Sequence, residues 1–328
     1  MITQILSNNS IQKKKKERGK TIIREDIFSK NVTEFIRSKV NQKEFFLAYY
    51  LTGKYSGALK VCREGNTNLC EHLHQEADFF FIDHVRNPIT KNFIQAIALP
   101  AKAYLAYKHQ RYADAIKLSE ETLLIDEALE KEELIEIHIH KLQQFQNIGR
   151  IYHRRKQFDR WIEISIELLN YQLMLVPPSQ YPSMWSFVKL KKCNDLLQKR
   201  MIIQVLDEII NFCFFDFSTR VAFQKQIFNQ LHFTEKSYLL SDLLQKWIDA
   251  KNCFWEVNQE EALQQLSSFL TNEVPGVNLS FLKIDLLIDA FYGCTSEEDQ
   301  LTIVNTISSY HIPKGIQTTI LNALHRST

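Results

Sequence analysis

One phrase recurs three times in the first half of this chain, and it constrains the fold more than any other feature. In each copy an aromatic residue ends a helical segment, four or five mostly polar residues follow, and a second aromatic opens another helical segment. These opening aromatics are Tyr55, Tyr112 and Phe158. A helix, a short polar turn and a second helix, repeated along a chain, is typical of an α-solenoid, whose stacked units bury together what no single unit can bury. We therefore predict an all-α fold built from antiparallel helix pairs.

Glycine content excludes several common classes of enzyme. The chain has 8 glycines in 328 residues, and no two of them are spaced as in a G-x-G-x-x-G or G-x-x-x-x-G-K-[ST] loop. Backbone that cradles a phosphate needs such glycines, because only glycine takes positive φ without steric cost. The same scarcity, with 7 prolines, argues against a turn-rich β architecture.

Cysteine usage and the lack of long apolar runs indicate the compartment. None of the 6 cysteines forms a C-x-x-C pair, and most lie in apolar helical stretches, which is typical of free, buried thiols in a reducing environment. The first residues have no apolar core of signal-peptide length, and no apolar run is long enough to span a membrane. We expect a cytoplasmic protein that does not associate with membranes.

Changes in composition divide the chain into four parts. Residues 1–20 carry six basic residues against one acidic residue and read as a flexible basic tail, so the remainder of the chain is mildly acidic. Residues 21–176 contain the repeated phrase. Three prolines in residues 177–182 predict a linker, and residues 183–328 read as further helices in a repeat or a bundle. Apolar stripes at helical spacing in this last part cover residues 240–248, 262–270 and 281–291.

Motifs that would indicate catalysis or metal binding are missing. The chain contains no G-x-S-x-G, no H-E-x-x-H and no protein-kinase signature. The acidic residues fit polar helix faces, with no pair that stands out for acid–base work. We interpret His72, His74, His138 and His140 as surface or capping residues, because their spacings and neighbours are poor for a shared metal ion. We predict a non-enzyme without metal or cofactor.

The third copy of the phrase resembles the tetratricopeptide repeat. When Phe158 is placed at the aromatic position of the repeat's second helix, four residues fall on the signature positions of its first helix. These residues are Phe145, Ile148, Gly149 and Tyr152. The small residue of this set allows two helices to approach, so we expect Gly149 at a close helix–helix contact. Trp161 departs from the family, which has a small residue at that position.

Two further stretches carry the resemblance, residues 96–126 fairly and residues 39–64 weakly, so it covers about a third of the chain. The first of them departs from the family at Lys102, where an apolar residue is usual. It implies a right-handed superhelix whose inner groove, lined by the first helix of each pair, binds a peptide or helix of another protein. An asparagine at the position of Asn147 commonly holds a peptide backbone in this family. On the matched registers the groove would present Tyr104, Tyr107, Lys108, Gln146, Asn147, Arg150, His153 and Arg154.

Two functional hypotheses follow. The first is a protein-interaction scaffold or peptide-sensing adaptor whose groove captures a partner segment of acidic character. The second is a nucleic-acid-associated helical-repeat subunit that grips phosphates through Lys13–Lys16 in the tail and through the Arg150–Arg160 patch. The patch also fits a solvated helix end, where cations interact favourably with the helix dipole. The mildly acidic body of the chain favours the first hypothesis.

Overall fold

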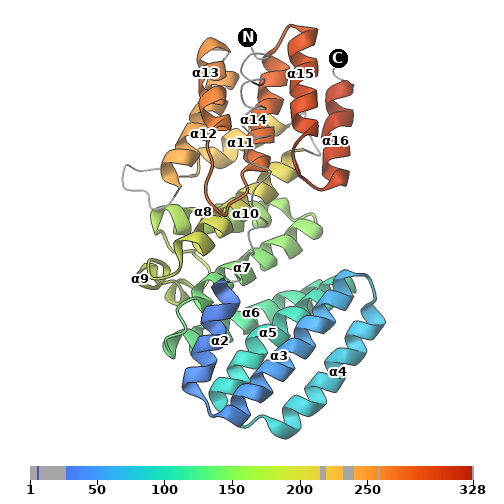
Figure 1. Cartoon of the computed structure of the whole chain (residues 1–328), viewed down its shortest axis with the longest axis vertical. Helices are drawn as coiled ribbons and strands as arrows, with labels where there is room; N and C mark the ends of the chain where they lie inside the picture. Colours follow the sequence, from blue (N-terminus) through green and yellow to red (C-terminus); the bar gives the residue numbers. More distant parts are fainter. Residues whose placement is uncertain (1–5, 7–26, 215–218, 232–239, 257–258, 327–328) are drawn as a thin grey trace. The chain divides into compact units, whose positions relative to one another are not determined.

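The computed structural model describes residue 6 and residues 27–214, 219–231, 240–256 and 259–326. This described part is helical and contains no β-strand, as the all-α prediction requires (Figure 1). Two compact units divide the chain. We call Arg24–Leu168 with Pro177–Leu197 the N-terminal unit, and Leu169–Val176 with the described part of Gln198–Thr328 the C-terminal unit. Residues 177–182, which we predicted as a linker, thus belong to the N-terminal unit.

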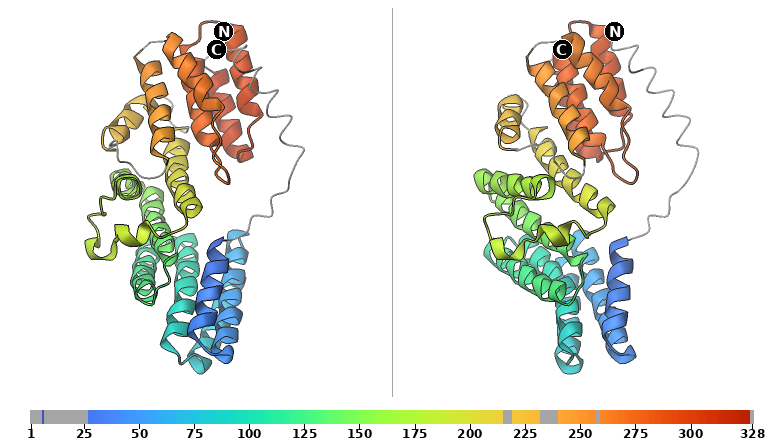
Figure 2. Two further views of the ribbon diagram at one scale, coloured as in Figure 1. Left: turned by 60° about the vertical axis from the view of Figure 1, so that its left-hand side comes forward. Right: turned by 90° about the vertical axis from the view of Figure 1, so that its left-hand side faces the viewer.

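The N-terminal unit is a row of helices joined by short turns, in which α3 packs against α4 and α5, α5 against α6, and α6 against α7 (Figure 2). Its helices are α2 (Ile27–Lys39), α3 (Gln42–Arg63), α4 (Thr67–His84), α5 (Pro88–Lys108), α6 (Tyr112–Lys131), α7 (Ile137–Arg154), α8 (Phe158–Met174), the 3₁₀ helix η1 (Pro182–Met184) and α9 (Phe187–Leu190). The last residues of α8 belong to the C-terminal unit. The handedness of a superhelix stays a prediction.

The predicted turns before Tyr112 and Phe158 are confirmed. Each turn places one residue in the left-handed region, Gln110 at φ 59° and Lys156 at φ 60°. In the first turn the N–H of Arg111 donates to the carbonyl of Ala106 at 2.9 Å, and the same bond closes the second turn at 3.0 Å. This is the Schellman pattern, which satisfies the last carbonyls of a helix and reverses the chain in three residues.

The turn expected before Tyr55 is wrong, because α3 continues from Gln42 to Arg63 through Gly53. Leu51 and Tyr55, four residues apart on one side of α3, are both buried, at 0% and 1% exposure. A turn between them would remove one of the two from the core, so burial of both favours an unbroken helix. The chain reverses later, at Gly65, whose φ of 96° suits glycine.

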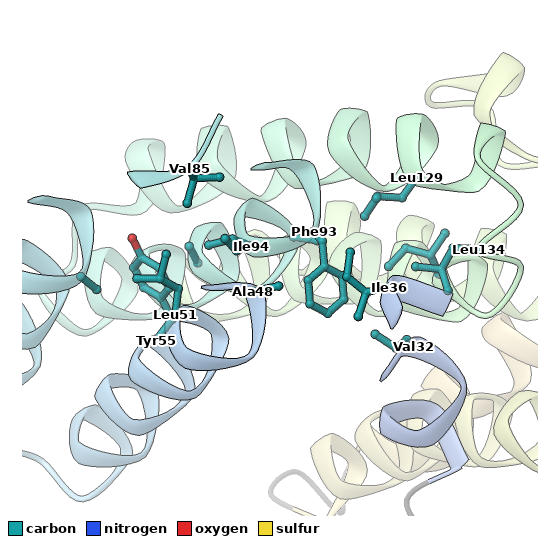
Figure 3. Close-up of a cluster of buried hydrophobic side chains, with 14 residues drawn as sticks. Val32, Ile36, Ala48, Leu51, Tyr55, Val85, Phe93, Ile94, Leu129 and Leu134 are labelled. Carbon is teal, nitrogen blue, oxygen red and sulfur yellow. The ribbon is translucent and has the colours of Figure 1, made fainter. Parts of the chain in front are cut away.

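One core cluster of the N-terminal unit joins helices that are distant in sequence (Figure 3). Val32 and Ile36 of α2 pack with Ala48 and Leu51 of α3, and Phe93 of α5 lies among them. Burying a side chain of this size contributes about 1.5–3 kcal/mol. The cluster therefore fixes α2, which lies outside the three predicted pairs, onto α3 and α5.

Gly149 lies at a close contact between α7 and α8, as predicted. A Cβ atom added to Gly149 would lie 3.2 Å from Cγ2 of Ile164 and 3.6 Å from Cδ1 of Trp161. Trp161 is 3% exposed. The large side chain of Trp161 therefore packs where Gly149 leaves space, which explains how this pair departs from the pattern of the tetratricopeptide repeat and still packs closely.

The C-terminal unit is also helical, and α12 packs against α13 and α14, α14 against α15, and α15 against α16. Its helices are α10 (Asp195–Cys213), of which the first residues belong to the N-terminal unit, α11 (Arg220–Phe228), α12 (Ser241–Trp255), α13 (Gln259–Leu270), α14 (Ser280–Gly293), α15 (Glu297–Ser308) and α16 (Lys314–His325). The three predicted apolar stripes fall on α12, α13 and α14 and supply buried residues to the core.

Candidate functional site

The α5 part of the predicted groove is a cluster of tyrosines and cations at the C-terminal end of that helix. The rings of Tyr104 and Tyr107 lie 6.0 Å apart, and both side chains are partly buried. Two cations lie over the ring of Tyr104, with Nζ of Lys108 at 5.4 Å and Cζ of Arg63 at 5.8 Å from its centre. Both tyrosines are thus partly covered by the helices, and Tyr104 also holds two cations through cation–π attraction.

A chain of side-chain hydrogen bonds runs along α7 to the groove residues Asn147 and Arg150. Arg150 Nη1 donates to Asn147 Oδ1 at 2.7 Å, and Asn147 Nδ2 donates to Gln144 Oε1 at 3.3 Å. Gln144 Nε2 donates to Nε2 of His140 at 3.0 Å. The Nδ1–H of His140 then donates to Asp126 Oδ2 at 2.8 Å. Partly exposed Arg150 is therefore oriented by a network that begins at a fully buried carboxylate.

The remaining α7 residues of the predicted groove differ in exposure. Gln146 is 3% exposed and contributes almost no accessible surface. The ring of His153 lies edge-on to Trp161 at 4.6 Å. Burial, together with the charge of Arg154, lowers the pKa of His153, so this imidazole is neutral at pH 7. Arg154 itself is exposed at the end of α7.

The two confirmed turns share a shallow pocket of about 420 Å³, which is lined by residues 110–114 and by Arg155. Arg111 lies 3.8 Å from Asp114 across this region, and both arginines are exposed. The pocket brings the turn before α6 together with the turn after α7. The basic patch is partly neutralised at its far end, where Arg160 pairs with Glu163 at 2.8 Å.

The chemistry of this region is that of recognition by arginine and tyrosine. Guanidinium groups form paired hydrogen bonds with carboxylates or phosphates, and tyrosine adds rigid aromatic area with a hydroxyl. The nearest thiols are unreactive at neutral pH, because burial raises the pKa of Cys70 to about 12 and also raises the pKa of Cys62. The tail residues Lys13–Lys16, assigned to phosphate binding in the second hypothesis, lie outside the described residues.

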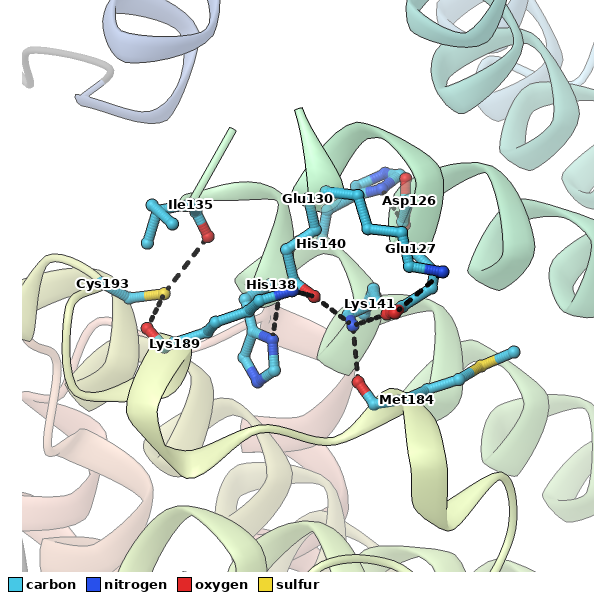
Figure 4. Close-up of polar contacts among 11 residues, drawn as sticks. Asp126, Glu127, Glu130, Ile135, His138, His140, Lys141, Met184, Lys189 and Cys193 are labelled. Carbon is cyan, nitrogen blue, oxygen red and sulfur yellow. Dashed lines mark hydrogen bonds and ion pairs between the residues drawn. The ribbon is translucent and has the colours of Figure 1, made fainter. Parts of the chain in front are cut away.

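Sequence reasoning missed a buried ionic cluster between α6, α7 and the segment that contains η1 and α9 (Figure 4). His138 Nδ1 donates to Glu130 Oε1 at 2.5 Å. Lys141 Nζ donates to Glu130 Oε2 at 2.8 Å and to the carbonyl of Met184 at 2.6 Å. Lys189 Nζ reaches Glu130 Oε2 from α9 at 2.8 Å. One carboxylate of α6 thus holds the segment after α8 against α6 and α7.

Protonation states in this cluster follow from burial and charge. Burial opposes ionisation of Glu130, but the hydrogen bond from His138 and the charge of Lys141 prevail and lower its pKa to about 2. Burial lowers the pKa of His138 despite the neighbouring carboxylate. Burial raises the pKa of Asp126, whose Oδ1 accepts no hydrogen bond from any described residue. The stable arrangement at pH 7 is an ionised Glu130 beside a neutral imidazole.

The interpretation of the histidines as surface or capping residues is wrong for three of them. His138 is 0% exposed, His140 8% and His74 4%, because His138 and His140 have buried carboxylates as partners and His74 lies 3.9 Å from the sulfur of Cys70. The assignment of the acidic residues to polar helix faces is also wrong for two acidic residues of α6. The sequence did contain an indication that these acids are buried, because the helical spacing of the buried stripe on α6 continues through two acidic residues. This stripe is Ser119, Leu123, Asp126 and Glu130.

A second buried ionic cluster joins α11, α12 and α14 in the C-terminal unit. Arg220 donates to Asp285 Oδ1 at 2.7 Å and to Asp289 Oδ1 at 2.6 Å. Lys251 Nζ donates to the second oxygens of the same carboxylates at 2.6 and 2.5 Å. Gln224 adds a bond to Asp285 at 3.0 Å. Two cations face two anions, so the cluster is balanced and acts as a cross-link between helices.

No group of three or more histidine, cysteine, aspartate or glutamate side chains in the described ranges is arranged to hold a metal ion. Asp78, close in sequence to His72 and His74, instead accepts from the hydroxyl of Tyr55 and from Lys102, each at 2.6 Å. Likewise, among the described helices none has the length and apolar character needed to cross a membrane.

Comparison with known proteins assigns no family, since no family model, curated protein or solved structure matches this chain.

Proposed function

We propose that this chain is a non-catalytic interaction scaffold that captures an acidic segment of a partner along the exposed ends of α5 and α7. One observation carries the proposal. Lys108, Arg154 and Arg155 are exposed and form no ion pair within the part of the chain that the structure describes. They lie at the ends of the two helices that carry the tyrosine cluster and Arg150.

Such cations favour an anionic partner for a physical reason. An exposed arginine is weakly hydrated, so little free energy is lost when a carboxylate replaces its water. Tyrosine beside arginine is also a common combination at binding hot spots, because it joins rigid aromatic area to a forked donor. Asn147 and Arg150 are already hydrogen-bonded to each other at 2.7 Å, which lowers the entropy lost when the pair meets a ligand.

The competing account is that Tyr104 and Tyr107 fill the core and that the arginines only solvate a helix end. Partial burial of both tyrosines is compatible with either account. The three exposed cations that form no ion pair with a described residue favour the first, because the cations of a solvated face often pair with nearby acids, as Arg160 does with Glu163.

The test is a titration of fluorescein-labelled peptides with the full chain, followed by fluorescence anisotropy. The peptides combine fixed glutamates with random apolar residues. Arg150→Glu with Arg154→Glu should abolish binding of any peptide that the wild type binds. The matched control is Lys30→Glu with Lys91→Glu, which reverses two exposed cations on α2 and α5 and should leave binding unchanged.

A folded Arg150/Arg154 double variant that keeps full peptide binding would exclude this site. The same titration with a labelled single-stranded oligonucleotide tests the second hypothesis. Tight binding of the oligonucleotide, with a steep loss of affinity as salt rises and a loss in the same variant, would assign the patch to phosphates instead.

A further inference from the structure

A second surface of the N-terminal unit, on α3 and α4, exposes far more aromatic area than is usual for a helix pair that only faces water. We call it the aromatic face. Its members and their exposed fractions are Phe46 (58%), Tyr49 (69%), Tyr50 (46%), Phe79 (71%) and Ile82 (67%). Single exposed apolar residues are ordinary, but five of them on two helices that pack against each other mark a docking surface.

The area of the aromatic face fits the apolar centre of a protein interface. With about 200 Å² for each fully exposed aromatic side chain, its four aromatics expose about 500 Å². A standard interface covers about 800 Å² on each partner, and in homodimers about 65% of that area is apolar. The aromatic face alone therefore supplies close to the apolar share of one side of such an interface.

The shape of the face is complementary to itself. A shallow pocket of about 370 Å³ lies between α3 and α4, lined by residues that include Phe46, Tyr50 and Phe80. Its floor is set by the tilted contact of Tyr50 with Phe80, whose ring centres are 5.3 Å apart. Phe79 follows next on α4 and projects into solvent. One surface thus carries both a protruding aromatic side chain and a hollow of the size that accepts one.

The charges of the face are complementary in the same sense. Lys43 lines the pocket, and Asp83 is exposed one helical turn after Phe79. Neither Lys43 nor Asp83 forms an ion pair with another residue that the structure describes. Because residues i and i+4 of a helix share a face, a copy that inserts Phe79 into a pocket brings its Asp83 toward the Lys43 that lines that pocket.

We propose that the aromatic face is the dimer interface of this protein and that its occupant is a second copy of the chain. In a two-fold arrangement each Phe79 fills the pocket of the other copy, and Lys43 of each copy pairs with Asp83 of the other. The balanced charge of the face argues for this occupant over an acidic or basic peptide, which would meet as much repulsion as attraction there. The proposal is independent of the peptide site on α5 and α7.

The experiment is sedimentation equilibrium of the full chain from low to high micromolar concentration. We expect a monomer–dimer equilibrium that Phe79→Ser shifts strongly to monomer. Leu124→Ser is the matched control, because Leu124 is 59% exposed on α6 of the same unit but lies off the face. Both positions are exposed, so both variants should keep the helical circular dichroism of the wild type.

A charge swap separates this interface from any other mode of association. Lys43→Asp and Asp83→Lys should each weaken the dimer, since each places like charges opposite one another. The double variant should restore dimerisation, because it exchanges the two signs. A wild-type chain that stays monomeric throughout the concentration range overturns the proposal and leaves the face to a different protein. A dimer that Phe79→Ser does not weaken, or that the double swap does not restore, overturns it as well.

Discussion

The close contact at Gly149 gives the sharpest test of how α7 and α8 pack. Replacing Gly149 with leucine introduces a Cβ atom 3.2 Å from Cγ2 of Ile164, closer than ordinary contact, before any further carbon is placed. The remaining carbons of leucine would then compete with the ring of Trp161, whose Cδ1 is 3.6 Å from the same Cβ position. Overpacking of a well-packed core costs about 1–3 kcal/mol, and we expect the upper half of this range.

A second glycine provides the matched control. Gly53 also lies inside a helix, but a Cβ atom added there meets nothing within 4 Å. Gly53→Ala should therefore stabilise the protein by about 0.5–1 kcal/mol, the ordinary gain in a helix interior. Gly149→Ala has the same intrinsic gain but must displace Ile164. We expect Gly53→Ala to be the most stable of these proteins and Gly149→Leu the least stable. The wild type and Gly149→Ala should lie between them.

The measurement is equilibrium urea denaturation of the full chain, followed by helical circular dichroism. Ile164→Ala combined with Gly149→Ala completes a double-mutant cycle, and coupling of about 0.5 kcal/mol or more is expected for side chains in contact. If Gly149→Leu unfolds at the wild-type midpoint, the packing of α7 on α8 is not as described. A destabilised Gly53→Ala would show instead that α3 contains a turn at this glycine.

Two further predictions concern the buried ionic clusters. The folded-state pKa of His138 lies below its ordinary value of 6.5. The contribution of neutral His138 to the unfolding free energy is therefore fully present above pH 6.5 and is lost as the pH falls below it. His138→Gln should therefore flatten the dependence of the unfolding free energy on pH between 7 and 5, by up to about 1.4 kcal/mol per pH unit; an unchanged slope would contradict the assignment. Lys251→Met should cost about 3–5 kcal/mol, because it leaves Asp285 and Asp289 with one cation for two buried carboxylates. Lys225→Met, at an exposed lysine on α11, is its control, and equal effects of the two substitutions in urea denaturation would show that the cluster contributes nothing.

Part of the predicted site followed from the register of the repeat, and part of it did not. The register assigned Tyr104 and Arg150 to the first helices of successive pairs, and both lie partly exposed on α5 and α7. It also assigned Gln146, which is buried. Register fixes the direction of a side chain on its own helix, but burial depends on which other helices cover that direction. The aromatic face was missed for the same reason.

The sequence by itself determined the local features of the fold. Polar turns ended α5 and α7, and apolar periodicity marked α12 to α14. Each of these depends on backbone preferences and hydrogen bonds within a few residues, so each can be read from a short window.

Only the tertiary structure decided where polar residues are buried and whether a helix continues. α3 continues as a helix where a turn was expected, because Leu51 and Tyr55 are both buried in a core that also includes α2 and α5. Glu130 is buried because Lys189 arrives from a segment 59 residues later in the chain, and Asp285 because Lys251 lies 34 residues before it. A buried ionised carboxylate is costly unless a cation and hydrogen bonds compensate its charge. That cation comes from another helix, so a window of sequence around the carboxylate holds no sign of it.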